Sequence, residues 1–337
     1  MGNRYESAAY RELGAMLRRV RERAGLSAPE LAGRLGWSLT TISRMENGRR
    51  TSTTTDVIQY AVMCGAKVPE VRPLVEFTRV AERKEGYYLS DDYIGGSLQS
   101  LIFHESSAER VLGYEPQVIP GLLQAPAYAR ALVAAVNSEQ SEGWVAGVVR
   151  TRMERRRILS LPNPARFTFY LHEHALRLAV GTDEVMQEQL LHLVLTAALE
   201  NISVRVVPSA ARERSAFGGG FQLMEFHGHR PVVSVDNLRF GGLIVDEPDY
   251  VQSYRRLVPM LADVAFDEGQ SREFVAELAD EYDRGSQRRV ADVLAEEQLQ
   301  RRSGNELRGG GVAEEQLQRR VGHQLRGGGV DPTPIYE

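Results

Sequence analysis

Residues 26–50, LSAPELAGRLGWSLTTISRMENGRR, decide the fold of the N-terminal region. Ser27, with a glutamate three residues later, is typical of a capping box at the start of a helix, and Gly36 ends that helix. Ser38 is a second N-cap, and Gly48 follows its helix, at a position where a left-handed backbone costs little only for glycine. The stretch therefore predicts two short helices joined by a turn of about three residues.

Apolar residues extend this pattern into a small helical core. Upstream, four of them recur with the spacing of one helix face: Leu13, Met16, Leu17 and Val20. In the two short helices we expect four more to pack together: Leu31, Leu35, Ile42 and Met45. The second short helix then presents its opposite side to solvent, where it can lie in a DNA major groove.

The same stretch resembles the xenobiotic-response-element (XRE) helix-turn-helix family, which is related to phage repressors, over about residues 11–68. In that family the N-terminal half of the third helix reads base edges, which the resemblance places at Ser38, Leu39, Thr40, Ser43 and Arg44. Arg44 can pair bidentately with guanine O6 and N7, and Leu39 can touch a thymine methyl group. Many members have a glutamine where this chain has Ala28, so we expect narrower base reading here.

The resemblance also implies which residues hold the DNA backbone and the helices. Phosphate contacts, which set register rather than specify sequence, are expected at Ser27, Asn47, Arg49, Arg50 and Thr51. An internal ion pair of the family would join Arg21 to Glu46 and fix the third helix against the first. The alternative is a domain of this family that has lost DNA binding, and the arginines after the third helix argue against it.

Charge separates the N-terminus from the rest of the chain. The net charge is -4, but residues 1–60 contain 10 arginines and 6 acidic residues, which leaves 31 basic and 39 acidic residues elsewhere. We therefore expect affinity for nucleic acid near the N-terminus. The single cysteine, Cys64, excludes an intrachain disulfide, and no apolar run resembles a signal peptide or a membrane span. These features predict a cytoplasmic, nucleoid-associated protein with no membrane contact.

Strand and helix patterns are mixed after residue 94. RFTFYLHEHALRLAV (166–180) begins like a strand, ISVRVVP (202–208) is another strand, and DEVMQEQLLHLVLTAALEN (183–201) is an amphipathic helix. FQLMEFHGHRPVVSVDNL (221–238) predicts two strands joined by a turn, and we expect a last helix over 248–267.

Five segments of this region, VIPGLLQAPAYARAL, FYLHEHALR, NISVRVVP, GFQLMEF and VVSVDNL, resemble the C-terminal domain of actinobacterial XRE regulators. That domain has no known function, and the resemblance covers about residues 95–275. It implies developmental or antibiotic-related gene control, often with a small companion protein encoded nearby.

We therefore predict a multidomain chain with an all-α, lambda-repressor-like helix-turn-helix domain over 8–68 and a larger α+β domain over 95–284. A helical linker is expected over 69–94, and a low-complexity tail over 285–337. The tail contains a near-identical tandem repeat, AEEQLQRRSGNELRGGGV (295–312) and AEEQLQRRVGHQLRGGGV (313–330). Each repeat has too few apolar residues to form a core. The tail could bind a partner, but a flexible appendage that function does not require is favoured. We expect deletion of residues 285–337 to leave the folded domains intact.

The sequence contains no convergent catalytic or metal-binding set. His172 and His174, two apart in a strand, would share one face and could bind zinc, but no third ligand is near, which favours local hydrogen bonding. The glycines at 218–220 lack the lysine and helix start of a P-loop. The arginines within 145–159 could bind DNA or an acidic partner, although a solvated helix face is favoured. We expect no enzymatic activity, no metal and no cofactor.

The leading hypothesis is a sequence-specific transcriptional regulator that binds double-stranded DNA as a homodimer on a palindromic operator. Its C-terminal domain would mediate dimerisation, sense a ligand or bind a small companion protein. The alternative is an antitoxin-like interaction module whose main role is to bind a small cognate protein. An enzyme fused to a DNA-binding domain is less favoured.

Overall fold

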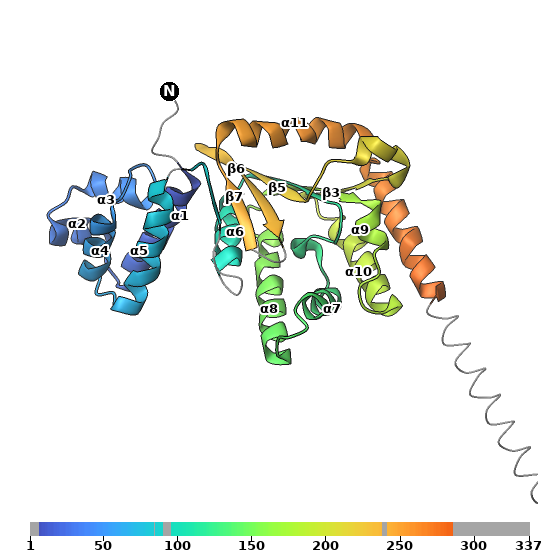
Figure 1. Ribbon diagram of the computed structural model, residues 1–337, viewed down its shortest axis with the longest axis horizontal. Coiled ribbons are helices and arrows are strands. Elements are labelled where there is room, and N and C mark those ends of the chain that lie inside the picture. The colour runs from blue at the N-terminus through green and yellow to red at the C-terminus, as the bar shows by residue number, and fades with distance from the viewer. Residues whose placement is uncertain (1–6, 84, 90–95, 238–240, 286–337) are drawn as a thin grey trace, which may run out of the picture. The chain divides into compact units, whose positions relative to one another are not determined.

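The computed structural model describes residues 7–83, 85–89, 96–237 and 241–285 of the 337-residue chain (Figure 1). The described residues up to Asp280 pack as one compact unit. Within the described residues, an all-α region precedes a larger α+β region, as the sequence predicts. The two tandem repeats lie outside the described residues.

The N-terminal helices begin and end close to the capping residues. They are α1 (Ala8–Arg23), α2 (Ala28–Leu35), α3 (Leu39–Glu46), α4 (Thr54–Met63) and α5 (Val68–Arg83). Ser27 and Glu30 form the capping box of α2, and the Ser38 side chain accepts a backbone N–H of the first turn of α3. Gly36 and Gly48 have φ values of 67° and 65°, so each reverses the chain after a helix in a conformation that suits glycine.

α1 and α3 pack so closely that glycine is required where they meet. A Cβ atom at Gly14 would lie 2.5 Å from the carbonyl oxygen of Met45, and one at Gly48 would lie 2.6 Å from the Cα atom of Arg11. Around this contact the fully buried side chains are Leu13, Leu17, Leu31, Ile42, Met45, Val57 and Tyr60. The inner side of α3 is therefore fixed by packing against its neighbours.

A seven-stranded mixed sheet forms the centre of the described part of the α+β region. Its order is β1 (Tyr87–Leu89), β7 (Gly241–Val245), β6 (His229–Asn237), β5 (Phe221–Phe226), β2 (Arg110–Glu115), β3 (Arg166–His172) and β4 (Ile202–Val207). β2, β3 and β4 run parallel, and the other neighbouring pairs are antiparallel. The parallel strands are joined by helical crossovers, as such strands require.

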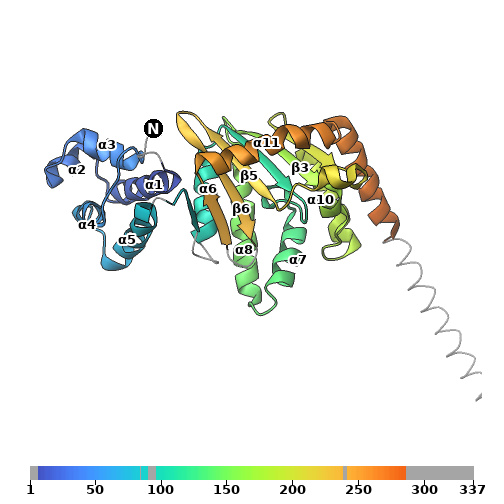
Figure 2. The ribbon, with the colours of Figure 1, turned by 45° about the horizontal axis from the view of Figure 1, so that its top comes forward.

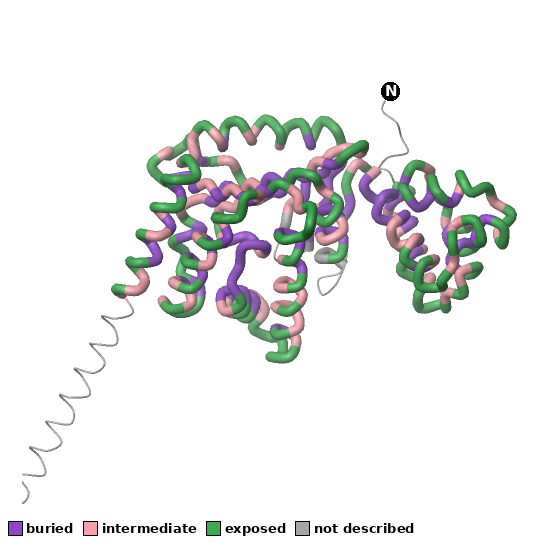
Figure 3. The backbone as a smooth tube through the Cα atoms, turned by 180° about the vertical axis from the view of Figure 1, so that it is seen from behind, coloured by how far each residue is buried: buried purple, intermediate pink, exposed green. Residues whose placement is uncertain are grey.

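Helices cover both faces of this sheet (Figures 1 and 2). α11 (Pro248–Val264) lies along one face, and the other face is covered by α6 (Gly96–Ser107), α7 (Pro126–Val136) and α8 (Glu142–Arg155). The remaining helical segments are α9 (Glu173–Arg177), α10 (Asp183–Thr196) and the 3-10 turns η1 (Gly121–Leu123), η2 (Arg156–Ser160) and η3 (Ser209–Ser215). Most residues of the central strands are buried as a result (Figure 3).

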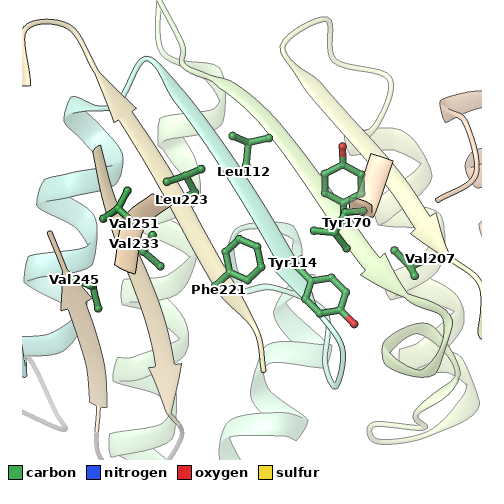
Figure 4. Packing of buried hydrophobic residues seen from close by; sticks show 10 residues of the cluster. Leu112, Tyr114, Tyr170, Val207, Phe221, Leu223, Val233, Val245 and Val251 are labelled. Atoms are coloured by element: carbon green, nitrogen blue, oxygen red, sulfur yellow. The ribbon is translucent and has the colours of Figure 1, made fainter. Parts of the chain in front are cut away.

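The core on the α11 side is a cluster of aromatic and aliphatic side chains (Figure 4). It contains Leu112, Tyr114, Tyr170, Val207, Phe221, Leu223, Val233, Val245, Val251 and Leu261. Side chains alternate along a strand, so the residues between these positions face α6, α7 and α8. This alternation defines the second face of the sheet.

Three segments differ from the sequence predictions. Residues 69–94 were expected to be a helical linker, but α5 packs against α1 and α4, and β1 pairs with β7 at the sheet edge. β7 was also not predicted from the sequence. Residues 268–285 are helical, although the helix over 248–267 was expected to be the last. In each case the missing information is a contact with a part of the chain that is distant in sequence.

Candidate nucleic-acid interface

The outer face of α3 carries four of the side chains predicted to read bases, and the fifth, Ser38, is the N-cap whose hydroxyl accepts the Thr41 N–H at 3.0 Å. Ser38, Leu39, Thr40, Ser43 and Arg44 are exposed, and half of the Leu39 surface is accessible to solvent. Ile42 and Met45, on the inner side of the same helix, are 0% and 1% exposed. α3 thus presents polar groups, one cation and one aliphatic side chain to solvent, which is the combination that reads base edges in a major groove.

Glu46 and Arg21 form the ion pair that was expected to fix α3 against α1. The Arg21 Nε lies 2.6 Å from Glu46 Oε1, and its Nη2 lies 2.8 Å from Oε2. Tyr60 of α4 donates its hydroxyl to Oε1 at 2.6 Å, and the Arg18 Nε donates to Oε2 at 3.1 Å. Burial alone would raise the pKa of Glu46, but these hydrogen bonds outweigh it and hold that pKa below its ordinary value.

Tyr60 and Arg18 are the members of this cluster that the sequence reasoning missed. Tyr60 is fully buried, and both its burial and the Glu46 carboxylate raise the pKa of its hydroxyl, which therefore stays protonated and donates. The only sequence signal was a tyrosine in the apolar pattern of the helix after α3. A buried tyrosine hydroxyl normally has a hydrogen-bond partner, but the pattern does not say which.

The residues after α3 differ in how available they are to a phosphate. Arg49 is exposed, whereas Arg50 is half-buried with its Nη2 4.0 Å from Asp56 Oδ2. The Asn47 Nδ2 donates to Ser43 O at 2.7 Å, and its Oδ1 accepts from Arg18 at 3.0 Å. Thr51 is half-buried. Two of the four predicted phosphate contacts that follow α3 are cations, and Arg49 is the more exposed of the two.

Ser27, the fifth predicted phosphate contact, is occupied within its own helix cap. Its hydroxyl donates to Glu30 Oε2 at 2.6 Å, and its backbone N–H donates to the same oxygen at 2.7 Å. These hydrogen bonds lower the pKa of Glu30, so a carboxylate stands at the start of α2. A phosphate at this point would have to displace that carboxylate and would be repelled by it. The structure therefore disfavours Ser27 as a phosphate contact.

Two family profiles match the chain. Residues 12–74 match a profile described as a helix-turn-helix domain, and residues 98–277, more than half of the chain, match one described as a domain of unknown function (DUF5753). The chain belongs to the DUF5753 family. No curated protein and no solved structure matches it. The helix-turn-helix profile covers the whole cluster around Glu46 and indicates DNA binding.

The first helix of the DNA-binding region also contacts the DUF5753 domain through a buried polar network. The Glu12 carboxylate accepts hydrogen bonds from Ser100 Oγ at 2.5 Å and from the Tyr88 hydroxyl at 2.6 Å. The His104 Nε2 lies 2.8 Å from the same hydroxyl. Because the single Tyr88 proton goes to Glu12, His104 must donate through a protonated Nε2.

Burial controls the charge of this network. His104 is fully buried, and burial, helped by the Arg11 guanidinium, lowers its pKa to about 3. Burial raises the pKa of Glu12 against the hydrogen bonds it accepts. Arg11 lies with its guanidinium carbon 4.0 Å from the centroid of the Phe226 ring, close enough for a cation–π contact. α1 is therefore tied both to α3 and to the sheet.

The other candidate residues of the DUF5753 domain have local roles. His172 ends β3 and is the N-cap of α9, because its Nδ1 accepts the His174 N–H at 3.0 Å. His174 therefore lies in the first turn of α9 and does not share a strand face with His172. This corrects the expectation of two histidines on one face. In the helix-turn-helix region, at the end of α4, burial raises the pKa of Cys64 to about 11, which disfavours a reactive thiolate. Within the described residues, no group of three potential ligands could hold a metal ion.

Several arginines within residues 145–159, in α8 and at the start of η2, are less solvated than the sequence favours. Arg155 is buried and forms a bidentate pair with Glu105, at 2.7 and 2.6 Å. Arg152 donates to the Gln124 side chain at 2.9 Å, and Arg156 donates to the Gln124 carbonyl at 3.1 Å. Three of these arginines therefore organise the sheet face under α8. Across the described residues, no helix is both long and apolar enough to cross a membrane.

Proposed function

We propose that this protein is a sequence-specific transcriptional regulator that reads DNA through the exposed face of α3. The observation that carries this proposal is the five exposed side chains from Ser38 to Arg44 on a helix and its N-cap, where the other side of the helix is held by the Glu46 cluster. A helix held in this way can enter the major groove without rearranging its own domain.

We also propose a regulator family for the chain. The cap pattern and the Arg21–Glu46 pair support a place among the XRE, lambda-repressor-like regulators of actinobacteria. Binding to an operator implies a cytoplasmic protein associated with the nucleoid. We assign no catalytic role to the DUF5753 domain and propose instead that it has a regulatory or an interaction role.

Genome-wide mapping of binding sites tests the role of α3. We expect the wild-type chain to occupy discrete sites and Arg44→Ala to lose them, because one bidentate arginine–guanine pair contributes about 1–3 kcal/mol of discrimination. Arg150→Ala, which removes an exposed arginine from α8, is the matched control and should keep the wild-type pattern. Equal occupancy by wild type and Arg44→Ala would contradict base reading by α3.

A homodimer on a palindromic operator is the form we propose for the DNA complex. A helix-turn-helix module makes a small interface, and two half-sites increase affinity and specificity. The DUF5753 domain has a stripe of exposed leucines at helical spacing on and just after α10: Leu191, Leu195 and Leu199, of which Leu195 is 71% exposed. Such a stripe supports packing against a second apolar surface. We assign it to the partner chain of the homodimer.

The molar mass in solution tests this assignment. We expect a dimer for the wild type and a shift towards monomer for Leu195→Glu, because a buried unpaired carboxylate opposes packing. Ile58→Glu, at an exposed apolar residue of α4, is the matched control and should remain dimeric. A monomeric wild type that forms a complex with a small protein encoded nearby would instead support the interaction-module alternative.

A further inference from the structure

An open cavity of about 690 Å³ lies on the α11 side of the sheet, at the margin of the core cluster. Its floor is formed by β6 and β7, where Val235 pairs with Leu243 across the two strands. Both side chains are only half-buried, although they pack against the buried core cluster. The fold therefore leaves an apolar part of this sheet face incompletely covered.

α11 supplies the helical wall of this cavity. Tyr250, Tyr254 and Leu257 follow one another at the spacing of one helix face, and all three line the cavity. Tyr254 and Leu257 also pack against the core cluster, whereas Tyr250, at the rim, is 58% exposed. The wall is therefore aromatic and aliphatic, although the exposed face of a surface helix usually carries polar residues.

The loop before β5 forms the third wall. It contributes Phe217 and the three glycines that follow it. A Cβ atom at Gly218 or Gly219 would meet no atom within 4 Å, so no described part of the chain fills the space beside these two residues. The absence of side chains here lets the backbone approach a flat ligand closely.

The core holds two aromatic rings of these walls in place. Phe217 packs edge-on against Tyr114, with ring centroids 5.6 Å apart, and the ring centroid of Tyr254 lies 4.9 Å from that of Phe221. Tyr114 and Phe221 are buried neighbours on the same sheet face (Figure 4). Rings that are fixed before a ligand arrives lower the entropy cost of binding it.

The chemistry of the lining favours an uncharged ligand. None of the described lining residues is charged, and the polar side chains among them are tyrosines and Ser253, whose hydroxyl donates to Tyr250 O at 2.6 Å. An ionised ligand would lose water here without gaining a counter-charge, whereas an uncharged ring would gain apolar and aromatic contacts. The volume also lies within the roughly 300–1,000 Å³ of small-molecule sites.

We propose that this cavity binds an uncharged, largely apolar small molecule that contains an aromatic ring system. The ring would lie on the floor formed by β6 and β7, between Phe217 and Tyr254. Tyr87 of β1 also lines the cavity, and the next residue, Tyr88, donates to Glu12 of the DNA-binding region. An effect of the ligand on DNA binding rests on the proposed function, whereas its binding to the DUF5753 domain does not.

Fluorescence titration of the full chain with N-phenylnaphthylamine tests this proposal. This probe is uncharged and its fluorescence rises in apolar sites, and anilinonaphthalene sulfonate has the same rings with an added negative charge. We expect saturable binding of the uncharged probe at one molecule per chain. Binding of the sulfonate should be about tenfold weaker or more, because the cavity offers its charge no partner.

Substitutions separate this cavity from other apolar surfaces of the chain. Tyr250→Ala removes an exposed wall residue and should weaken binding of the uncharged probe about fivefold or more. Met260→Ala, at a 54% exposed residue of α11 outside the cavity, is the matched control and should bind like wild type. Leu243→Trp should abolish binding, because the added indole occupies the cavity.

Folding and self-association are measured on the same samples. Tyr250 and Met260 are exposed, so their variants should keep the wild-type melting temperature and decide the test if Leu243→Trp does not fold. The proposal is overturned if N-phenylnaphthylamine does not bind saturably, if the sulfonate binds as tightly, or if folded Tyr250→Ala binds like wild type. It is also overturned if Tyr250→Ala converts a wild-type dimer to monomer, because a second copy would then cover the cavity. None of these readouts depends on DNA.

Discussion

At the scale of single residues, Glu46 determines how α3 is held. Its carboxylate accepts hydrogen bonds from α1 through Arg21 and Arg18 and from α4 through Tyr60. The residue is 6% exposed, so these donors replace the water that an ionised carboxylate requires. Removing it would leave the Arg21 charge and the Tyr60 hydroxyl without their acceptor.

We expect Glu46→Ala to lower the free energy of unfolding by about 3 kcal/mol, because breaking one partner of a buried pair leaves an uncompensated charge. Denaturant unfolding measures this value. Arg23→Ala is the control, since its exposed side chain lies 3.7 Å from Glu70 and such pairs contribute about 0–1 kcal/mol. If both substitutions lowered the free energy of unfolding equally, Arg21 and Glu46 would not behave as a buried ion pair.

His104 makes a second residue-scale prediction, for the dependence of stability on pH. The unfolded chain protonates this histidine near pH 6.5, whereas the folded chain excludes the proton until about pH 3. Above pH 6.5 the burial of neutral His104 therefore has no effect on the free energy of unfolding. As the pH falls from 6.5 to about 3, that free energy decreases by up to about 1.4 kcal/mol per pH unit. Glu12, whose folded pKa is raised, acts in the opposite direction.

Comparison with His104→Gln isolates the histidine, because glutamine can donate to Tyr88 but does not titrate. Urea unfolding at pH values between about 6.5 and 4.5 should show a smaller loss of stability for the variant than for the wild type. Parallel losses in the two proteins would mean that His104 is not kept neutral in the folded state.

At the scale of elements, two glycines of similar backbone conformation differ in what surrounds them. A Cβ at Gly36 would meet no atom within 4 Å, whereas one at Gly48 would lie 2.6 Å from the backbone of Arg11. Gly36→Ala should lower stability by about 1–2 kcal/mol, the cost of a left-handed residue. Gly48→Ala should lower it further, because α1 and α3 must also separate. A difference in melting temperature between the variants checks this, and equal values would contradict the close contact.

The same elements show what a single sequence can predict. The caps and glycines around α2 and α3 are local signals, so the helix bounds follow from a few neighbouring residues. β1 has three residues and β7 begins with two glycines, so neither has a usable alternation, and their pairing joins residues 87–89 to 243–245. The Gln124 contacts of Arg152 and Arg156 likewise depend on how α8 packs. The sequence predicted which face of α3 is exposed, but not these contacts of Gln124.

At the scale of the whole molecule, positive charge is concentrated where DNA contact is expected. Residues 1–60 contain 10 of the 41 basic residues and 6 of the 45 acidic ones. Arg49 and Arg50, which follow the recognition helix, should supply affinity without sequence preference. The buried network around Glu12 joins this region to the DUF5753 domain through α1, which also packs against α3.

We expect the double variant Arg49→Ala, Arg50→Ala to lose affinity uniformly across DNA sequences. The slope of log affinity against log salt should become shallower by up to about 2, since each phosphate contact contributes about 0.9. Fluorescence titration at several salt concentrations measures the slope. The contribution of Arg50 should be the smaller one, because it lies beside Asp56. An unchanged slope would exclude phosphate contacts at both positions.

Base reading by α3 is tested most directly by selecting bound sequences from a random DNA pool with the purified full chain. We predict a guanine preference in each half-site for the wild type that disappears in Arg44→Ala, while the preferences at other positions remain. Arg44→Lys should also weaken the guanine preference, because lysine lacks the bidentate geometry of arginine. A selected sequence that is identical for wild type and Arg44→Ala would contradict the account.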